Sequence, residues 1–112
     1  MKNIVFFWAL VAFSCNAFAL TYNEFKEQLS GSGNAVPKIY IMGVGNGIMA
    51  SNSYRTHAEG IDPLFCLPSK LELNADNMIS ILDNFVTQDE RYPNQDVDAL
   101  LIFALIDTFP CD

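Results

Sequence analysis

The side chains best suited to nucleophilic or metal chemistry are few and far apart in this sequence. They are one histidine, His57, and three cysteines, Cys15, Cys66 and Cys111. A nucleophilic site requires a thiol or hydroxyl held beside a base, and a zinc site combines several Cys or His ligands. His57 has only Glu59 as a neighbouring ligand, in a polar segment typical of a solvated loop. We therefore predict no catalytic residue, no metal site and no cofactor.

Carboxylate pairs are the other candidates for chemistry, because acid–base catalysis often uses two of them. Asp96 with Asp98, and Asp89 with Glu90, are close in sequence. Such pairs catalyse hydrolysis only in a cleft that raises the pKa of one partner. An acidic surface always provides pairs of this kind, and a short helical domain has little room for a cleft. The sequence therefore predicts a protein that is not an enzyme and acts by binding.

The first 19 residues have the pattern of a secretory signal peptide. Lys2 supplies a positive start, residues 4–13 form an apolar run, and Ala17-Phe18-Ala19 is an A-x-A cleavage motif. Cleavage after Ala19 would leave one exported domain, residues 20–112, with no membrane span. Two alternatives would keep the chain at a membrane, namely an uncleaved anchor or a lipid attached to Cys15.

Two cysteines, Cys66 and Cys111, remain after this cleavage. An even number of cysteines in an exported chain predicts a disulfide between them. Closing a loop of about 45 residues contributes about 4 kcal/mol by the chain-entropy estimate, which is a large share of the stability of a small domain. Loss of Lys2 changes the formal net charge from −7 to −8. Such a charge argues against a nucleic-acid partner and favours a basic protein.

Capping signals and apolar spacing predict two helices in the first half of the mature chain. Thr21 and Glu24 form a capping box ahead of a short helix over residues 22–28. Pro37 suits the first position of a longer helix over residues 37–56, because its missing N–H group is not needed there.

Glycines four residues apart on this second helix predict close packing against another helix. Gly43, Gly47 and Ser51 share one face, and small side chains let helices approach closely. We expect the C-terminal helix to be that neighbour. The segment 43–47 (GVGNG) could alternatively bind phosphate, but it lacks the Lys-Ser/Thr of a P-loop and follows no strand.

The second half of the chain predicts two further helices. Asn74 is a candidate N-cap for a helix that ends near Gln88. The last helix begins near Asp96, is apolar on almost all sides, and is stopped by Pro110. We expect it to be buried. The predicted fold is therefore all-α, a compact bundle of about four helices around this C-terminal helix.

The segment 87–95 between the last two helices has no apolar periodicity and is predicted to be an exposed turn. Its simplest interpretation is a solvated connector. A second interpretation is a recognition loop, because Tyr and Arg are frequent binding hot spots. Its candidate contact residues are Asp89, Glu90, Arg91, Tyr92 and Asn94.

Four short motifs follow one another between residues 40 and 111. They are Tyr40-x-x-Gly43-x-x-x-Gly47, Phe65-Cys66-x-Pro68, Ala99-x-x-x-x-Ala104-Leu105 and Phe109-Pro110-Cys111. In this order, and behind a signal peptide, they resemble the Rap/Tai-type immunity proteins of type VI secretion. The resemblance implies an all-α fold with a disulfide, a periplasmic location, and a partner that is a secreted peptidoglycan amidase.

The resemblance also implies how such a protein would work. The amidases are cysteine–histidine enzymes that cut the peptide stems of the cell wall, and a loop between helices of the immunity protein plugs their cleft. By its position between helices, that loop is segment 88–95 here. Family members are often dimers, so a homodimer is also expected. Two alternative functions remain from composition: a periplasmic acid-stress chaperone, and a structural envelope protein or small-ligand carrier without a toxin partner.

Overall fold

The computed structural model describes residues 19–112, which form four α-helices and one short 3-10 helix. The elements are α2 (Tyr22–Ser30), α3 (Ala35–His57), α4 (Ala75–Val86), η1 (Tyr92–Asn94) and α5 (Val97–Thr108). Within these residues there is no β-strand, only an isolated antiparallel bridge between Thr21 and Asp96. The predicted all-α fold is confirmed. Residues 1–18, with Cys15 and almost all of the predicted signal peptide, lie outside the described part.

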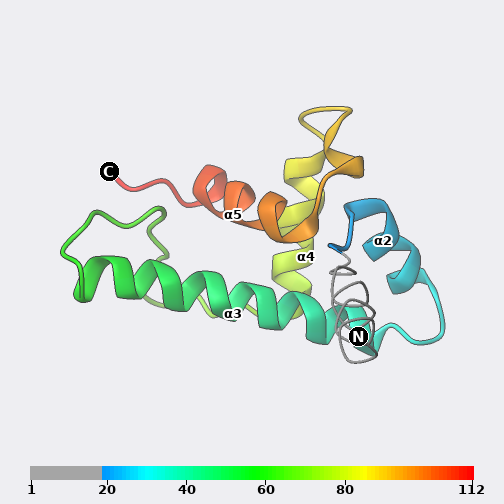
Figure 1. Ribbon diagram of the computed structural model, residues 1–112, viewed down its shortest axis with the longest axis horizontal. Coiled ribbons are helices and arrows are strands. Elements are labelled where there is room, and N and C mark those ends of the chain that lie inside the picture. Colours follow the sequence, from blue (N-terminus) through cyan, green and yellow to red (C-terminus); the bar gives the residue numbers. More distant parts are fainter. Residues whose placement is uncertain (1–18) are drawn as a thin grey trace, which may run out of the picture.

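The helices pack around a shared apolar centre. In Figure 1, α3 runs along the lower side, α5 lies above it, and α4 stands across both. α4 packs against both α5 and α3, and α2 packs beside α3 and η1. The chain therefore places the α4–α5 connection at the end of the molecule that is opposite α3 (Figure 1).

The core consists of apolar side chains from all four helices and from the segment before α4. It contains no buried polar or charged side chain among residues 19–112. Its members are Phe25, Ile41, Phe65, Met78, Leu82, Phe85, Val86, Val97, Leu100, Leu101, Ala104 and Leu105. Five of these residues belong to α5, which confirms that the C-terminal helix is central. However, α5 is buried on one side only, because Phe103 on its other side is 57% exposed.

The predicted helix starts are confirmed where a side chain caps the helix. The Thr21 hydroxyl accepts from the Glu24 N–H, and Glu24 accepts in turn from the Thr21 N–H. Asn74 caps α4 in the same reciprocal way with Asn77. Each pair satisfies backbone groups that a helix start leaves without partners.

The helix boundaries differ from the prediction by one or two residues. α2 continues to Ser30, and α4 stops at Val86 instead of near Gln88. α3 begins at Ala35, so Pro37 is its third residue. Proline is tolerated there because the first four N–H groups of a helix have no partner within the helix.

The predicted packing role of Gly43 and Gly47 is wrong. Both are exposed, and a Cβ added at either would meet nothing within 4 Å. The buried glycine is Gly45, where an added Cβ would collide with the end of the Met78 side chain on α4. Since each residue turns a helix by about 100°, Gly45 faces away from Gly43 and Gly47. The close approach is therefore between α3 and α4, not between α3 and α5.

The predicted disulfide is confirmed. Cys66 and Cys111 are bonded, with their Cα atoms 5.0 Å apart. The Cys66 N–H also donates to the Phe109 carbonyl at 2.9 Å. These links tie the C-terminus to the segment before α4. Within residues 19–112, no helix combines the length and the apolar character that crossing a bilayer requires.

Candidate functional site

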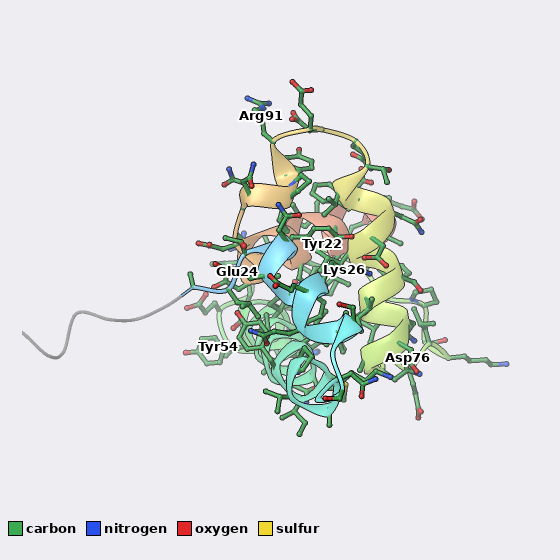
Figure 2. The ribbon with its side chains drawn as sticks, turned by 90° about the vertical axis from the view of Figure 1, so that its right-hand side faces the viewer. Tyr22, Glu24, Lys26, Tyr54, Asp76 and Arg91 are labelled. Carbon is green, nitrogen blue, oxygen red and sulfur yellow. A yellow bond between two sulfur atoms is a disulfide. The ribbon has the colours of Figure 1, made fainter. Side chains whose placement is uncertain are left out.

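The segment between α4 and α5 projects from the end of the bundle. Residues 87–91 form turns, and η1 then leads the chain back to α5. Figure 2 shows Arg91 at the tip of this projection, on the opposite side of the molecule from Tyr54 and Asp76. All five candidate contact residues of the predicted recognition loop therefore lie in one projecting segment, which we call the tip loop (residues 87–95).

An ion pair within the tip loop fixes its outer part. Arg91 donates from Nε to both oxygens of Asp89, at 2.9 and 3.2 Å, and from a terminal nitrogen at 2.6 Å. The Arg91 backbone N–H donates to the same carboxylate at 2.9 Å. These hydrogen bonds, the side-chain ones first, lower the pKa of Asp89 to about 2. The guanidinium remains largely exposed, since the Arg91 side chain is 80% accessible.

Tyr92 anchors the tip loop to α4. Its ring is stacked on Phe85, with ring centroids 4.9 Å apart and the planes inclined by 11°. Phe85 is a core residue, so this contact joins the loop to the interior. The structure therefore places Tyr92 half-buried, as a support for the loop, whereas Arg91 is its exposed neighbour.

The returning end of the tip loop is attached to α2. Asn23 donates from its side-chain amide to Asn94 Oδ1 at 3.2 Å, and the Tyr22 N–H donates to the Gln95 carbonyl at 3.0 Å. The Val97 N–H donates to the Leu20 carbonyl at 2.9 Å. Glu90 differs from the other candidates: it is exposed and, among the described residues, makes no ion pair.

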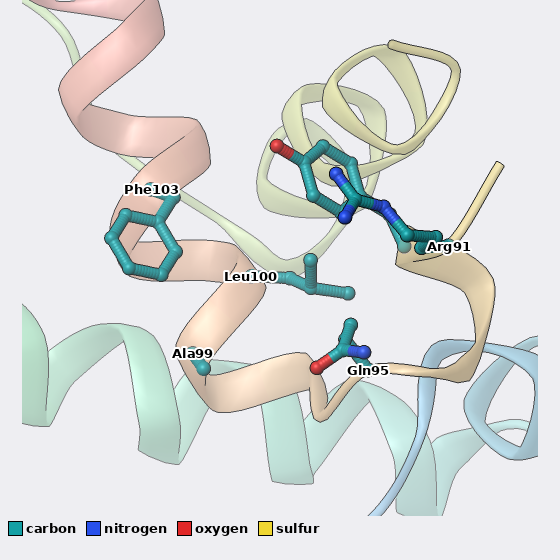
Figure 3. Close-up of a pocket in the computed structure, with 6 residues that line it drawn as sticks. Arg91, Gln95, Ala99, Leu100 and Phe103 are labelled. Atoms are coloured by element: carbon teal, nitrogen blue, oxygen red, sulfur yellow. The ribbon is translucent and has the colours of Figure 1, made fainter. Parts of the chain in front are cut away.

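A pocket of about 250 Å³ lies directly beside the tip loop. It is lined by Arg91, Tyr92, Gln95, Ala99, Leu100 and Phe103. Figure 3 shows Phe103 on one side, Arg91 on the other, and Leu100 between them. A broader hollow of about 500 Å³ lies at the far end of α3, around Tyr54 and Leu64. It contains none of the predicted contact residues.

Negative charge predominates around the tip loop. Residues 88–98 carry four carboxylates, at Asp89, Glu90, Asp96 and Asp98, and one guanidinium. Asp98 and Asp96 also act on Tyr40 of α3, whose pKa is raised by burial and then by these two charges. Residues 88–98 therefore carry a net charge of 1 − 4 = −3, with Asp89 and Glu90 in the tip loop and Asp96 and Asp98 near α3, and this charge suits a positively charged partner.

Sequence reasoning found the loop but missed the pocket. The sequence predicts that Ala99, Leu100 and Phe103 belong to a buried helix, and Ala99 is also part of one of the four motifs. The sequence feature that could have indicated the pocket is the wide apolar surface of α5. A domain of four helices cannot cover such a surface on all sides. Phe103 is left over on the uncovered side, 57% exposed.

The described residues offer no group of three or more His, Cys, Asp or Glu side chains that could hold a metal ion. His57 is exposed as the last residue of α3. Comparison of the chain with family models, with curated proteins and with solved structures found no match.

Proposed function

We propose that this protein is a periplasmic immunity protein that binds and inhibits a peptidoglycan amidase delivered by type VI secretion. The order of the motifs between Tyr40 and Cys111 supports this proposal, as does the signal-peptide pattern. The Cys66–Cys111 disulfide is consistent with an oxidising compartment such as the periplasm.

The observation that carries the proposal is the internal support of the tip loop. The loop is held by the Asp89–Arg91 pair, by the Tyr92–Phe85 stack and by the contact of Asn94 with α2. A loop that is already ordered loses little conformational entropy on binding, so more of its contact energy appears as affinity. Such a loop is suited to entering the cleft of an enzyme and excluding its substrate.

Charge supports the same interpretation. The carboxylates around the tip loop would steer the protein toward a basic cleft, which raises the association rate at low salt more than it changes the dissociation rate. Glu90 is the most informative residue for this effect. It is exposed and contributes nothing to an ion pair within the described residues, so its charge can be reversed without unfolding the loop.

The proposal predicts that a small secreted cysteine–histidine amidase is encoded beside the gene of this protein. The test is to measure binding of the purified amidase to the wild type, to Glu90→Lys and to Glu72→Lys at two salt concentrations. Glu72 is exposed before α4 and serves as the matched control for charge. We expect Glu90→Lys to associate about tenfold more slowly at low salt and Glu72→Lys to be unchanged. No binding by the wild type would refute the proposal.

A further inference from the structure

We infer that the pocket beside the tip loop is an anchor site for one large apolar side chain of a protein partner, flanked in that partner by Lys or Arg. The inference deepens the proposed function, because it takes this end of the molecule as the surface that meets the partner. It adds the chemistry of the segment that is recognised.

The size and lining of the pocket define the kind of group it accepts. Its volume of about 250 Å³ lies below the range typical of sites for drug-sized molecules. The Phe103 ring and the Arg91 side chain lie on opposite sides of the pocket, and Leu100 lies between them (Figure 3). Among the residues that line it, Arg91, Tyr92 and Gln95 carry polar side-chain groups. A single aromatic or branched aliphatic side chain fits this environment best.

The base of the pocket and the side formed by η1 are already in place without a partner. Leu100 belongs to the core and is 2% exposed, and Tyr92 is stacked on Phe85. The Gln95 backbone is fixed at both ends, because its N–H donates to the Tyr92 carbonyl and its carbonyl accepts from Tyr22. Burial of an apolar anchor in a preformed pocket is the usual form of an interface hot spot.

The charges near the pocket favour Lys or Arg as the partner residues on either side of the apolar anchor. Asp96 directly follows Gln95, and Asp98 directly precedes Ala99. Glu90 directly precedes Arg91. The one cation of the rim, Arg91, is already paired with Asp89. An anchor flanked by Lys or Arg therefore gains favourable contacts, whereas flanking Asp or Glu would face like charge.

The test uses short peptides and the mature disulfide-bonded protein. Acetyl-Lys-Trp-Lys-amide is titrated into ¹⁵N-labelled protein, with acetyl-Lys-Ala-Lys-amide and acetyl-Glu-Trp-Glu-amide as matched controls. We expect saturable amide shifts at Gln95, Ala99 and Phe103 with a Kd of about 1 mM, and at least tenfold weaker binding of both controls. Absence of saturable shifts, or equal binding of the three peptides, would overturn the inference.

Two variants with the same change of size localise the binding. Ala99→Trp fills the pocket, and Ala50→Trp fills the broader hollow at the far end of α3. Both alanines are exposed, so neither substitution overpacks the core. Ala99→Trp should abolish the shifts and Ala50→Trp should leave them unchanged; the reverse result would contradict the assignment.

Failure of the peptide test can be distinguished from failure of the amidase test. If the peptide binds in the pocket and the amidase does not bind, the anchor site stands and the immunity role falls. If the amidase binds with equal affinity to the wild type and to Ala99→Trp, the immunity role stands and the anchor inference falls.

Discussion

Alanine substitutions at three glycines of α3 should have opposite effects on stability. Gly43 and Gly47 are exposed, with open space where a Cβ would lie. Alanine at either position should stabilise the protein by about 0.5–1 kcal/mol, because it restricts the unfolded chain and favours the helix. Gly45 is buried, and alanine there would bring a Cβ within 2.8 Å of the Met78 Cε and still closer to its sulfur.

The cost at Gly45 follows from the burial of Met78. The Met78 side chain is 0% exposed, so it can move aside only by displacing other core residues. Overpacking a core in this way costs about 1–3 kcal/mol. After the gain in helix propensity of about 1 kcal/mol is subtracted, Gly45→Ala should destabilise the protein by up to about 2 kcal/mol. The gap between Gly45→Ala and Gly43→Ala should therefore be about 1–3 kcal/mol.

Urea denaturation of the disulfide-bonded protein, followed by circular dichroism, measures this gap. A difference of 1 kcal/mol also shifts the Tm of a domain of this size by about 4–8 °C. Gly47→Ala is the internal control and should behave like Gly43→Ala. If Gly45→Ala were as stabilising as Gly43→Ala, the close approach of α3 to α4 at Met78 would be wrong.

Three further predictions concern the contacts that hold the loop, the helices and the C-terminus. The Asp89 carboxyl should titrate at pH about 2 by NMR, and in Arg91→Ala its pKa should return toward 3.8. Because the folded-state pKa is lowered, the stabilising effect of this pair should be complete above pH 3.8 and be lost as the pH falls through about 2; an unchanged titration in Arg91→Ala would contradict it. Tyr22→Phe should lower the free energy of unfolding by about 1 kcal/mol, because the Tyr22 hydroxyl donates to Asp83 Oδ1 at 2.7 Å and joins α2 to α4; urea denaturation with no loss would show that this contact is dispensable. Reduction of the disulfide should lower the free energy of unfolding by about 4 kcal/mol, which urea denaturation with and without reductant measures; equal stability in both states would contradict this.

Local signals were sufficient to predict the helices and the disulfide. Capping residues mark two helix starts, Thr21 with Glu24 and Asn74 alone. They do so because the capping side chain forms a hydrogen bond with a backbone group only two or three residues away. The disulfide was predicted from the number of cysteines that follow the signal-peptide pattern and needed no knowledge of the fold. These features depend on neighbours in sequence, so the sequence carries them directly.

Features that depend on the direction of a helix face were not predictable in this way. Gly43 and Gly47 share a face, but their spacing does not indicate whether that face points inward. Phe103 is as apolar as its buried neighbours, yet none of the helices in residues 19–112 covers it, and it is 57% exposed. Tyr92 is of a residue type that is frequent in binding hot spots. Its stack on Phe85 shows that it supports the loop. The pocket beside the tip loop depends on the orientations of Phe103 and Tyr92, which local sequence does not determine.

Survival of cells that produce the proposed partner amidase in their periplasm tests the proposed immunity role most directly. Co-production of the protein with its signal-peptide pattern intact should prevent lysis. In the variant Tyr92→Ala, the tip loop loses its stack on Phe85. This variant should protect less while remaining folded and present in the periplasm. Equal lysis with and without the wild-type protein, at matched amidase levels, would contradict the immunity role.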